Sequence, residues 1–590
     1  MSAGAPPPFA ASPRHRAVAR YSAWGLALAV SAAGACGDDG GGTSNAGTNS
    51  GTAGVSASGS TGPSGQTSSE TDTGSSSGAS TTTGTGLTGT TSSSGGSTDT
   101  GIKFDLPVPD GGDDTDTDTD TGAVDESTCE AAAQSLTSAG CLFAPIVTKP
   151  NNLPWAVIAA NTGDVEAVAT LFDPNGAELE AATIQPGELH IFEFANTNSW
   201  AIDSSTTKGT RALRLESDRP VVAYQFLPYS SSQVATSDAA LLLPEHAWGD
   251  NYLALVPSND GSKWLTVVSL EDNNEVKVYI SEGADGSTAA GGGVPAMAPG
   301  GMHTEVLGAQ DVLRISAGQG GDPISGAAVY SSAPVAVYVG SPGMSLPGPG
   351  FQGWQDSIEE QIQPRAAWGT EYAVVKFRPR GGEGDLYRII ADKDGTVVTL
   401  SGDYQDQFNL DEGEFVEFLT AESFYASGNE AFLVGHYLVS ASENSGMKDD
   451  DMYPGWFTAS NNCGDGPTSP NSLGDLGDPA IGFIPPVDQF RSRYTFLTPD
   501  TYSWDMVTVV AQAGGWGTIT LDEQPLPEPT PLNGGDMVYA RFLVEDGPHY
   551  IESPSHKFGI EVYGYDCRIS YVYPGGLSLG SINVPPPPPG

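Results

Sequence analysis

The acidic side chains offer the most obvious material for chemistry, because Asp and Glu can hold cations or act as acid and base. Aspartates alternate with threonine over residues 114–120, a pattern that suggests a calcium loop. An EF-hand loop starting at Asp116 would need glycine at its sixth position and glutamate at its twelfth, where the chain has Thr121 and Ser127. We therefore expect weak, unspecific cation binding there, and calcium is the one cofactor that the pattern leaves open.

No spacing in the chain assigns a catalytic or metal-ligating residue. Asp449, Asp450 and Asp451 are adjacent, whereas the two carboxyl groups of a glycoside hydrolase must face the substrate from opposite sides. The 7 histidines include no H-E-x-x-H or similar metal-ligand spacing. Those at positions 190, 303 and 436 fall in or beside apolar segments, so we expect them to be structural. The sequence thus predicts a protein that is not an enzyme.

Cys36 stands at the end of a segment with the layout of a signal peptide. A basic stretch, residues 14–20, precedes a short apolar stretch at residues 24–32, and small residues lead from there to the cysteine. The apolar stretch is too short for a membrane-spanning helix, so residues 1–36 predict export. The residues around the cysteine resemble a bacterial lipobox, which implies that the Cys36 thiol is acylated and anchors the chain at the outer membrane or cell surface. Ordinary secretion without a lipid is the alternative.

Export makes the other cysteines candidates for disulfide bonds. They are Cys129, Cys141, Cys463 and Cys567. A set of four cysteines allows three pairings, and nearness along the chain favours Cys129–Cys141 together with Cys463–Cys567. Free thiols are the alternative.

The charge of the chain excludes one class of partner. Its 24 Lys and Arg residues face 72 Asp and Glu residues, which gives a formal net charge of −48. A protein that binds nucleic acid needs clustered bases to neutralise the phosphates. We therefore expect no nucleic-acid partner.

Residues 37–127 consist mainly of Ser, Thr, Gly and Asp, with almost no apolar side chains. Such a segment cannot bury enough surface to offset the entropy lost on ordering. We predict a disordered linker, which would hold the following region clear of a lipid anchor. At the other end, the Pro-rich tail 581–590 is expected to have no folded role.

From residue 128 the sequence has the pattern of an all-β protein. Short apolar runs rich in Val, Ile, Tyr and Trp alternate with turns of Gly, Pro, Asn and Asp, and no amphipathic helix of three turns interrupts them. The runs form about four tandem units of about 115 residues, each with about seven strands, the inventory of a β-sandwich. The predicted units are 128–240, 241–357, 358–477 and 478–580. Whether they are separate beads or pack on each other stays open.

An internal repeat supports this division. Pro244, Trp248, Gly249 and Tyr252 form a motif whose spacing returns about 120 residues later. The repeat consists of Pro364, Trp368, Gly369 and Tyr372, and in part of Pro486 and Tyr494. A duplicated unit is the simplest explanation, with the aromatic residues as core anchors.

The segment that contains the first copy of this motif also carries a family resemblance. Pro220 and Tyr224 lie in the run DRPVVAYQFLP, Asp238 opens a Leu-rich run that ends at Pro244, and the step from Gly249 to Tyr252 follows Trp248. Together these features resemble the N-terminal domain of the IgGFc-binding protein family, and the resemblance extends more weakly over residues 140–575. It implies an extracellular binding or adhesive module without known catalysis. The animal protein that gives the family its name has Cys-rich domains that this chain lacks, so antibody binding does not follow.

We therefore predict a lipid-anchored cell-surface protein that binds an extracellular macromolecule, either a protein or a glycan. Two alternatives from other classes stay open. One is an extracellular hydrolase acting on polysaccharide or peptide, and the other is a structural spacer of the cell surface.

Overall fold

The computed structural model describes residues 18–21, 126–148, 155–194, 200–226, 236–257, 262–318, 321–347, 355–380, 383–440, 476–566 and 568–588. All of them belong to one compact unit, which comprises Met1–Trp24 and Asp120–Gly590. Cys36, Cys463, Cys567 and the acidic runs 114–120 and 449–451 lie outside the described residues, as does nearly all of the predicted linker.

The described chain is almost entirely β structure, which confirms the all-β prediction. Its one α-helix in these residues, α1 (Cys129–Ser135), begins after Thr128, whose hydroxyl accepts a hydrogen bond from the backbone N–H of Ala131 and so caps the first turn. A disulfide joins Cys129 in α1 to Cys141, the pairing that nearness along the chain favoured. No helix in the described ranges is long and apolar enough to cross a membrane.

The first sheet runs in the order β5-β4-β8-β3-β6, and β2 and β9 also pair with β8. Its strands are β2 (Gly140–Phe143), β3 (Trp155–Ala160), β4 (Ala167–Phe172), β5 (Glu178–Ile184), β6 (Leu189–Phe194), β8 (Arg214–Phe226) and β9 (Ala239–Leu242).

The second sheet runs in the order β13-β12-β15-β11-β14-β7, and β10 and β16 also pair with β15. Its strands are β7 (Thr207–Thr210), β10 (Gly249–Leu253), β11 (Trp264–Ser269), β12 (Asn274–Tyr279), β13 (Met302–Leu307), β14 (Asp311–Ser316), β15 (Ala328–Met344) and β16 (Asp356–Gln361). Strand β7 precedes β8 in the chain yet joins this sheet, so it ties the first sheet to the second.

The third sheet runs in the order β1-β21-β18-β22-β19-β20, and β17 and β23 also pair with β22. Its strands are β1 (Val18–Tyr21), β17 (Gly369–Val374), β18 (Asp385–Ala391), β19 (Thr396–Gly402), β20 (Asp406–Leu410), β21 (Phe415–Thr420), β22 (Phe424–Leu438) and β23 (Ala480–Phe483). Strand β1, which lies inside the predicted signal peptide 1–36, pairs with β21 in parallel at the edge of the sheet, whereas the other pairings are antiparallel. Cleavage before Cys36 would remove this edge strand and leave the other strands of the sheet paired with one another.

Two smaller sheets, which we call the C-terminal pair, complete the described fold. One has the order β24-β30-β26-β27 and the other the order β28-β29-β25-β31-β32. Their elements are β24 (Arg493–Thr498), β25 (Trp504–Gln512), the 3-10 turn η5 (Ala513–Thr518), β26 (Thr520–Leu521), β27 (Gln524–Pro525), β28 (Thr530–Leu532), η6 (Asn533–Gly535), β29 (Met537–Val544), β30 (Gly547–Glu552), β31 (Phe558–Asp566) and β32 (Ile569–Pro574).

A long strand folds each of the first three sheets over into a sandwich-like shape. In β15, residues 328–331 pair with β12, whereas residues 336–340 pair with β11. The same change of partner occurs in β8, from β4 to β3, on either side of Pro220. Proline has no N–H to give to a ladder, and it lies here inside the strand, at the point where the ladder partner changes, rather than at the strand's start.

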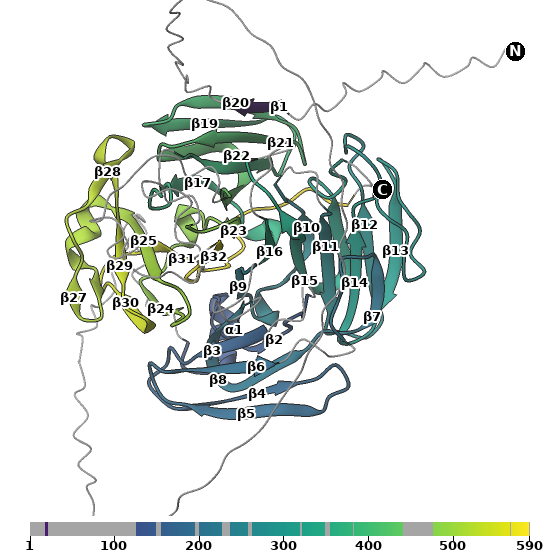
Figure 1. Cartoon of the computed structure of the whole chain (residues 1–590), viewed down its shortest axis with the longest axis horizontal. Helices are drawn as coiled ribbons and strands as arrows, with labels where there is room; N and C mark the ends of the chain where they lie inside the picture. Colours follow the sequence, from purple (N-terminus) through teal and green to yellow (C-terminus); the bar gives the residue numbers. More distant parts are fainter. Residues whose placement is uncertain are drawn as a thin grey trace, which may run out of the picture. The chain divides into compact units, whose positions relative to one another are not determined.

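Four short strands meet near the middle of the fold (Figure 1). β9 contacts β16, β16 contacts β23, β23 contacts β32, and β32 contacts β9, so the sheets form a closed ring. Each of these strands pairs with the sheet that precedes it in the chain. The boundaries predicted at 240/241, 357/358 and 477/478 therefore fall inside or just before β9, β16 and β23, strands that belong to one sheet and touch the next.

The repeated motif locks each sheet to the following one. Pro244, Pro364 and Pro486 each precede a 3-10 turn, η1 (Glu245–Ala247), η2 (Arg365–Ala367) or η4 (Val487–Gln489). Each turn packs on the strand β2, β10 or β17 of the preceding sheet. The contact is so close that a Cβ added at Gly140, Gly249 or Gly369 would lie 2.3, 2.6 or 2.4 Å from the Cβ of the facing proline.

The segment 126–138, before β2, and the segment that follows β32 close the ring between the first sheet and the C-terminal pair. The backbone N–H of Ser138 donates to Leu577 O at 3.0 Å, and the N–H of Leu579 donates to Leu136 O at 2.5 Å. Arg491 donates to Ser138 Oγ at 3.1 Å and to both carboxylate oxygens of Glu126 at 2.5 and 2.6 Å. A segment before β2 and a segment after β32 thus complete one junction.

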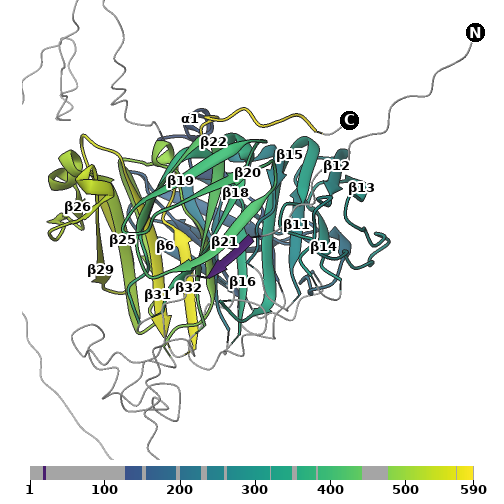
Figure 2. The same ribbon diagram turned by 90° about the horizontal axis from the view of Figure 1, so that it is seen from above.

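The C-terminal segment continues across the same end of the sheets that carries α1 (Figure 2). Gln489 donates to Gly580 O at 2.9 Å, Asn583 donates to Arg365 O at 3.0 Å, and Asn251 donates to Pro586 O at 3.0 Å. These bonds dock the start of the Pro-rich tail, which the sequence predicted to have no folded role. The tail is held because two of its backbone carbonyls and the Asn583 side chain find partners in η4, η2 and β10.

The close Gly–Pro contact predicts that Gly369→Ala destabilises the protein by about 1–3 kcal/mol, because the rigid ring of Pro486 leaves the new methyl no space. Gly517→Ala is the matched control, since nothing lies within 4 Å of a Cβ at that position. Urea unfolding of both variants measures the difference. Equal midpoints for the two variants would contradict the packing role of Gly369.

Candidate functional site

A buried or partly buried arginine crosses each junction between neighbouring sheets. Arg314 of β14 donates to Asp203 O at 2.9 Å and to Thr148 Oγ1 at 3.0 Å, both in the first part of the chain. Its guanidinium also lies 3.8 Å from the ring centroid of Trp264, and burial lowers the pKa of Arg314 to about 9 although Glu359 and Asp203 oppose the shift.

The other junctions have the same kind of contact. Arg388 of β18 donates to Glu417 at 2.7 Å, to Asp322 at 3.1 Å, and to the backbone of Val256, which follows β10 of the second sheet. Arg541 of β29 donates to Lys376 O at 2.8 Å and to Phe377 O at 2.9 Å. Together with Arg491 at the junction between the C-terminal pair and the first sheet, these arginines form hydrogen bonds across every junction of the ring.

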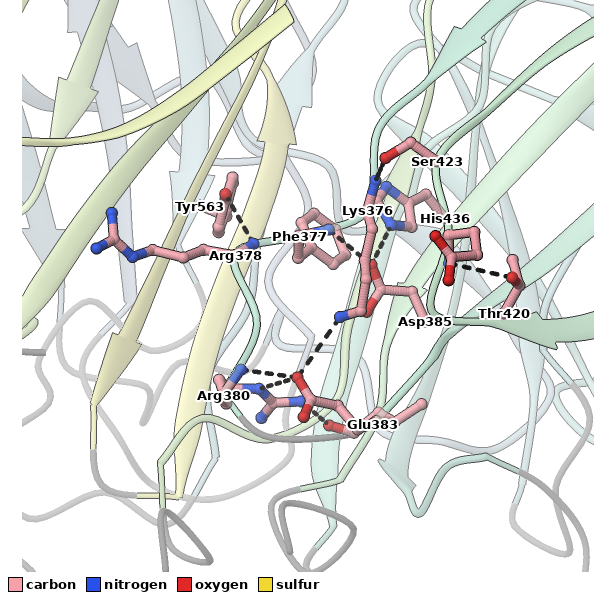
Figure 3. Close-up of polar contacts among 12 residues, drawn as sticks. Lys376, Phe377, Arg378, Arg380, Glu383, Asp385, Thr420, Ser423, His436 and Tyr563 are labelled. Carbon is pink, nitrogen blue, oxygen red and sulfur yellow. Dashed lines mark hydrogen bonds and ion pairs between the residues drawn. The ribbon is translucent and has the colours of Figure 1, made fainter. Parts of the chain in front are cut away.

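The junction between the third sheet and the C-terminal pair contains the richest cluster of ionisable side chains (Figure 3). His436 of β22 is fully buried, with Nε2 at 3.0 Å from Asp385 and Nδ1 at 3.1 Å from Glu561 of β31. Its ring stacks on Phe377 at 3.7 Å between centroids and on Tyr387 at 4.8 Å. Two carboxylates in line with both ring nitrogens and two aromatic faces fix this imidazole in place.

The electrostatics of the cluster follow from this geometry. Burial alone would lower the pKa of His436, but Glu561 and Asp385 outweigh burial and raise it to about 9. Burial would raise the pKa of Asp385, but Lys376 and His436 lower it to about 2. The imidazole is therefore protonated at neutral pH and donates from both nitrogens to carboxylates.

Lys376 completes the cluster from the chain that follows β17. Its Nζ lies 3.2 Å from Asp385 Oδ1 and 3.5 Å from Glu383 Oε1, with all three side chains almost fully buried. Figure 3 shows Lys376, Glu383 and Asp385 pointing toward one another, with Phe377 and His436 beside them. An amine, two carboxyl groups and an imidazolium are thus enclosed together.

A second group of buried carboxyl groups surrounds the place where the inner strands meet. Asp238 accepts hydrogen bonds from Ala239 N at 2.9 Å and from Glu359 N at 3.1 Å, and so links β9 to β16. Burial raises the pKa of Asp238 well above its usual range, and burial together with Asp478 does the same for Asp356. No set of three or more His, Cys, Asp or Glu side chains in the described ranges is arranged to hold a metal ion.

The family-motif residues all have scaffold roles. Tyr252 accepts from Gly249 N at 2.8 Å and donates to Val335 O at 2.7 Å within the second sheet, and Tyr372 and Tyr494 repeat this pair of bonds in the third sheet and in the C-terminal pair. Trp248 donates to Leu243 O at 2.8 Å. Tyr224 donates to Thr495 O at 3.1 Å across the closing junction. The motif therefore describes contacts within and between the sheets, and one of its residues, Pro220, also lines the recess described next.

An open recess of about 490 Å³ lies where the first sheet meets the C-terminal pair. It is lined by residues 126–128, residues 161–165, Arg219, Pro220 and Arg493. Arg219 donates to Ser127 O at 3.4 Å, and Arg493 is hydrogen-bonded to Tyr550. Neither guanidinium forms an ion pair with a carboxylate in the described part of the chain. Glu126, by contrast, is already bound by Arg491. We call this recess the Arg219/Arg493 cleft.

Sequence reasoning singled out Pro220 as a motif residue but did not find the cleft or the Lys376 cluster. The signal that could have helped is the scarcity of bases, because an arginine or lysine inside an apolar strand of so acidic a chain is a candidate for burial with a partner. Arg314 and Arg388 both stand in such strands.

The His436 cluster predicts a specific dependence of stability on pH. A pKa raised from 6.5 to about 9 gives a contribution that is fully present below pH 6.5 and is lost as the pH rises through about 9. We expect His436→Phe to cost about 3–5 kcal/mol at neutral pH, because it leaves Asp385 and Glu561 without their shared partner. The variant should also lack the loss of stability between pH 6.5 and 9.

Thermal unfolding of the protein and of His436→Phe across that range measures both effects. The control is His190→Phe, which removes a half-exposed histidine that pairs with Glu180. If the midpoint of thermal unfolding changed with pH by the same amount in all three proteins, the assignment of the proton to His436 would be refuted.

Comparisons with known proteins place the chain in a family. No curated protein matches it. A solved structure of E. coli alpha-2-macroglobulin in its native conformation aligns at 8% identity over 74% of this chain and 39% of that chain, with a TM-score of 0.11, too low to carry any argument. The family model described as IgGFc binding protein matches residues 238–564, from the start of the inner strand β9 into β31. Because this match covers more than half of the chain, the predicted resemblance is confirmed and the chain belongs to the IgGFc binding protein family.

Proposed function

We propose that this chain is a lipid-anchored cell-surface protein that binds another extracellular protein through the Arg219/Arg493 cleft, without catalysis. The observation that carries the proposal is the pair of guanidinium groups that line an open recess without ion-pair partners in the described residues. Basic side chains are scarce in a chain with a net charge of −48. The other arginines at the junctions already bind backbone or carboxylate oxygens of the fold; they are Arg314, Arg388, Arg541 and Arg491.

The chemistry of the cleft favours an acidic group on the partner. Two guanidinium groups from different sheets can hold a carboxylate by paired, charge-assisted hydrogen bonds. Residues 161–165 also line the recess with polar backbone and side-chain atoms, and they include the carboxyl group of Asp164. The strong negative charge over the rest of the chain would repel acidic surfaces elsewhere and so direct an acidic partner segment to this recess.

The family gives independent support for a binding role. Its printed description names the Fc part of IgG as what a member binds. We do not extend that ligand to this chain, because it has 5 cysteines in all and none of the Cys-rich domains of the protein that names the family. What we carry over is the class of function, which is recognition of a protein partner outside the cell.

The cleft predicts that charge reversal abolishes binding. The full exported chain is tested for binding to an array of extracellular proteins, peptides and glycans, with and without calcium, and IgG Fc is one of the proteins on the array. Each peptide and glycan is also analysed for cleavage products. We expect a protein ligand whose affinity falls at least about tenfold in Arg219→Glu/Arg493→Glu and falls further with salt.

Lys277→Glu is the control, because it reverses an exposed charge on β12 that already pairs with Glu275. Binding that survives the double reversal would contradict the cleft. Binding to glycans alone would contradict a protein partner, and cleaved products would favour the hydrolase alternative. No ligand at all would favour a spacer.

The lipid anchor is a separate proposal that rests on Cys36 and the residues before it. We expect Cys36→Ser to move the protein from the membrane fraction to the soluble exported fraction, because the thiol that carries the lipid is gone. Ser127→Ala, another small change near the predicted linker, is the control. Unchanged partition of the Cys36 variant into membranes would exclude the anchor.

A further inference from the structure

Lys376 is an unusual lysine because its amine is buried among carboxyl groups. Its relative exposure is 4%, that of Asp385 is 0% and that of Glu383 is 6%. Lysine is almost never so buried without a partner, since desolvation of an ammonium ion is costly. The next residue, Phe377, stacks on His436 and lies 4.9 Å from Tyr563, so aromatic rings border the cluster.

The reacting atoms are close, and the carboxyl group of Asp385 is oriented. Lys376 Nζ lies 3.2 Å from Asp385 Oδ1. The other oxygen, Oδ2, accepts hydrogen bonds from Phe377 N at 2.7 Å and from His436 Nε2 at 3.0 Å. Oδ2 of Asp385 thus has two hydrogen-bond donors, and the Lys376 amine lies beside Oδ1. The same arrangement stabilises the tetrahedral intermediate of acyl transfer.

Glu383 stands where it can move protons. Its Oε1 lies 3.5 Å from Lys376 Nζ and accepts from Arg380 N at 2.8 Å. Its Oε2 is buried and has no hydrogen-bond partner in the described residues. A carboxyl oxygen left without a partner is free to take a proton from the amine and return it to a leaving oxygen.

We propose that Lys376 and Asp385 are joined by an intramolecular amide bond, formed by the folded protein itself. Lys376 Nζ gives a proton to Glu383 and attacks the carboxyl carbon of Asp385. The negative charge gathers on Oδ2, where Phe377 N–H and the imidazolium of His436 stabilise it. Oδ1 then leaves.

The step balances without any outside reagent. The C–Oδ1 bond breaks as the N–C bond forms. Two of the three protons of the ammonium group leave with Oδ1 as one water, carried by Glu383, and the third stays on the amide nitrogen. His436 and Glu383 end in the states in which they began. The bond removes a buried ammonium–carboxylate pair and ties the chain after β17 to the start of β18, beside the junction with the C-terminal pair.

The mass of the purified full chain tests the bond directly. After reduction of disulfides, we expect a mass about 18 Da below that calculated for the processed chain with its lipid, the loss of one water. Trypsin should fail to cut after Lys376, and tandem mass spectrometry should place the link between Lys376 and Asp385. Lys376→Arg, which keeps the charge but has no primary amine, should have the full mass, and Glu383→Gln should slow or abolish the loss.

Lys393→Arg is the matched control, because Lys393 also pairs with a glutamate, Glu430 at 2.9 Å, but at the surface. It should keep the mass loss. A wild-type chain of full mass that is cut after Lys376 would overturn the proposal, and so would a link to Glu383 in place of Asp385. The wild-type mass decides the question even if a variant fails to fold.

Discussion

The fold depends on one constraint, which is that four short inner strands must each find an apolar neighbour on both sides. β9, β16, β23 and β32 pair with their own sheets along one edge and touch one another around the middle. None of the four sheet groups can bury its inner face alone, so the arrangement is stable only when it closes. The buried aromatic contacts between β8 and β32, with Tyr224 and Tyr573 at 4.6 Å, show where the last sheet meets the first.

Closure explains where the charges are. Apolar contact alone would let neighbouring sheets slide, whereas a guanidinium that donates to particular carbonyl and carboxylate oxygens fixes one register. Arg314, Arg388, Arg541 and Arg491 do this at the successive junctions, and the His436 cluster adds a protonated imidazole at the third of them. Burying a charged group costs free energy, and the several hydrogen-bond acceptors around each of these cations offset that cost. The Arg219/Arg493 cleft differs in this respect, which is why we assign binding to it.

Much of the fold could be predicted from the sequence, because alternating apolar runs and the Pro–Trp–Gly–Tyr spacing are local signals. That spacing marked Tyr252, Tyr372 and Tyr494, which anchor equivalent turns. The junctions could not be predicted, since their partners are far apart in the chain: His436 and Glu561 are 125 residues apart and Arg491 and Glu126 are 365 apart. For the same reason, the sequence could not predict the docking of the C-terminal tail or the pairing of β7, which joins the second sheet although its neighbours in the chain belong to the first. No local pattern encodes such pairs, and the cleft lies between elements that only closure brings together.

A closed scaffold that lines a recess with Arg219 and Arg493 is consistent with the binding role that we propose. The central claim is that the described β region is one cooperative structure. Calorimetric unfolding of the chain, beside a variant that ends at Pro574 and so lacks the closing segment, tests this claim most directly. The account predicts a single transition for the chain, with equal calorimetric and van't Hoff enthalpies, and a lower midpoint for the whole transition in the truncated variant. Several separate transitions, or a truncation that shifts one of them and leaves the others in place, would contradict it.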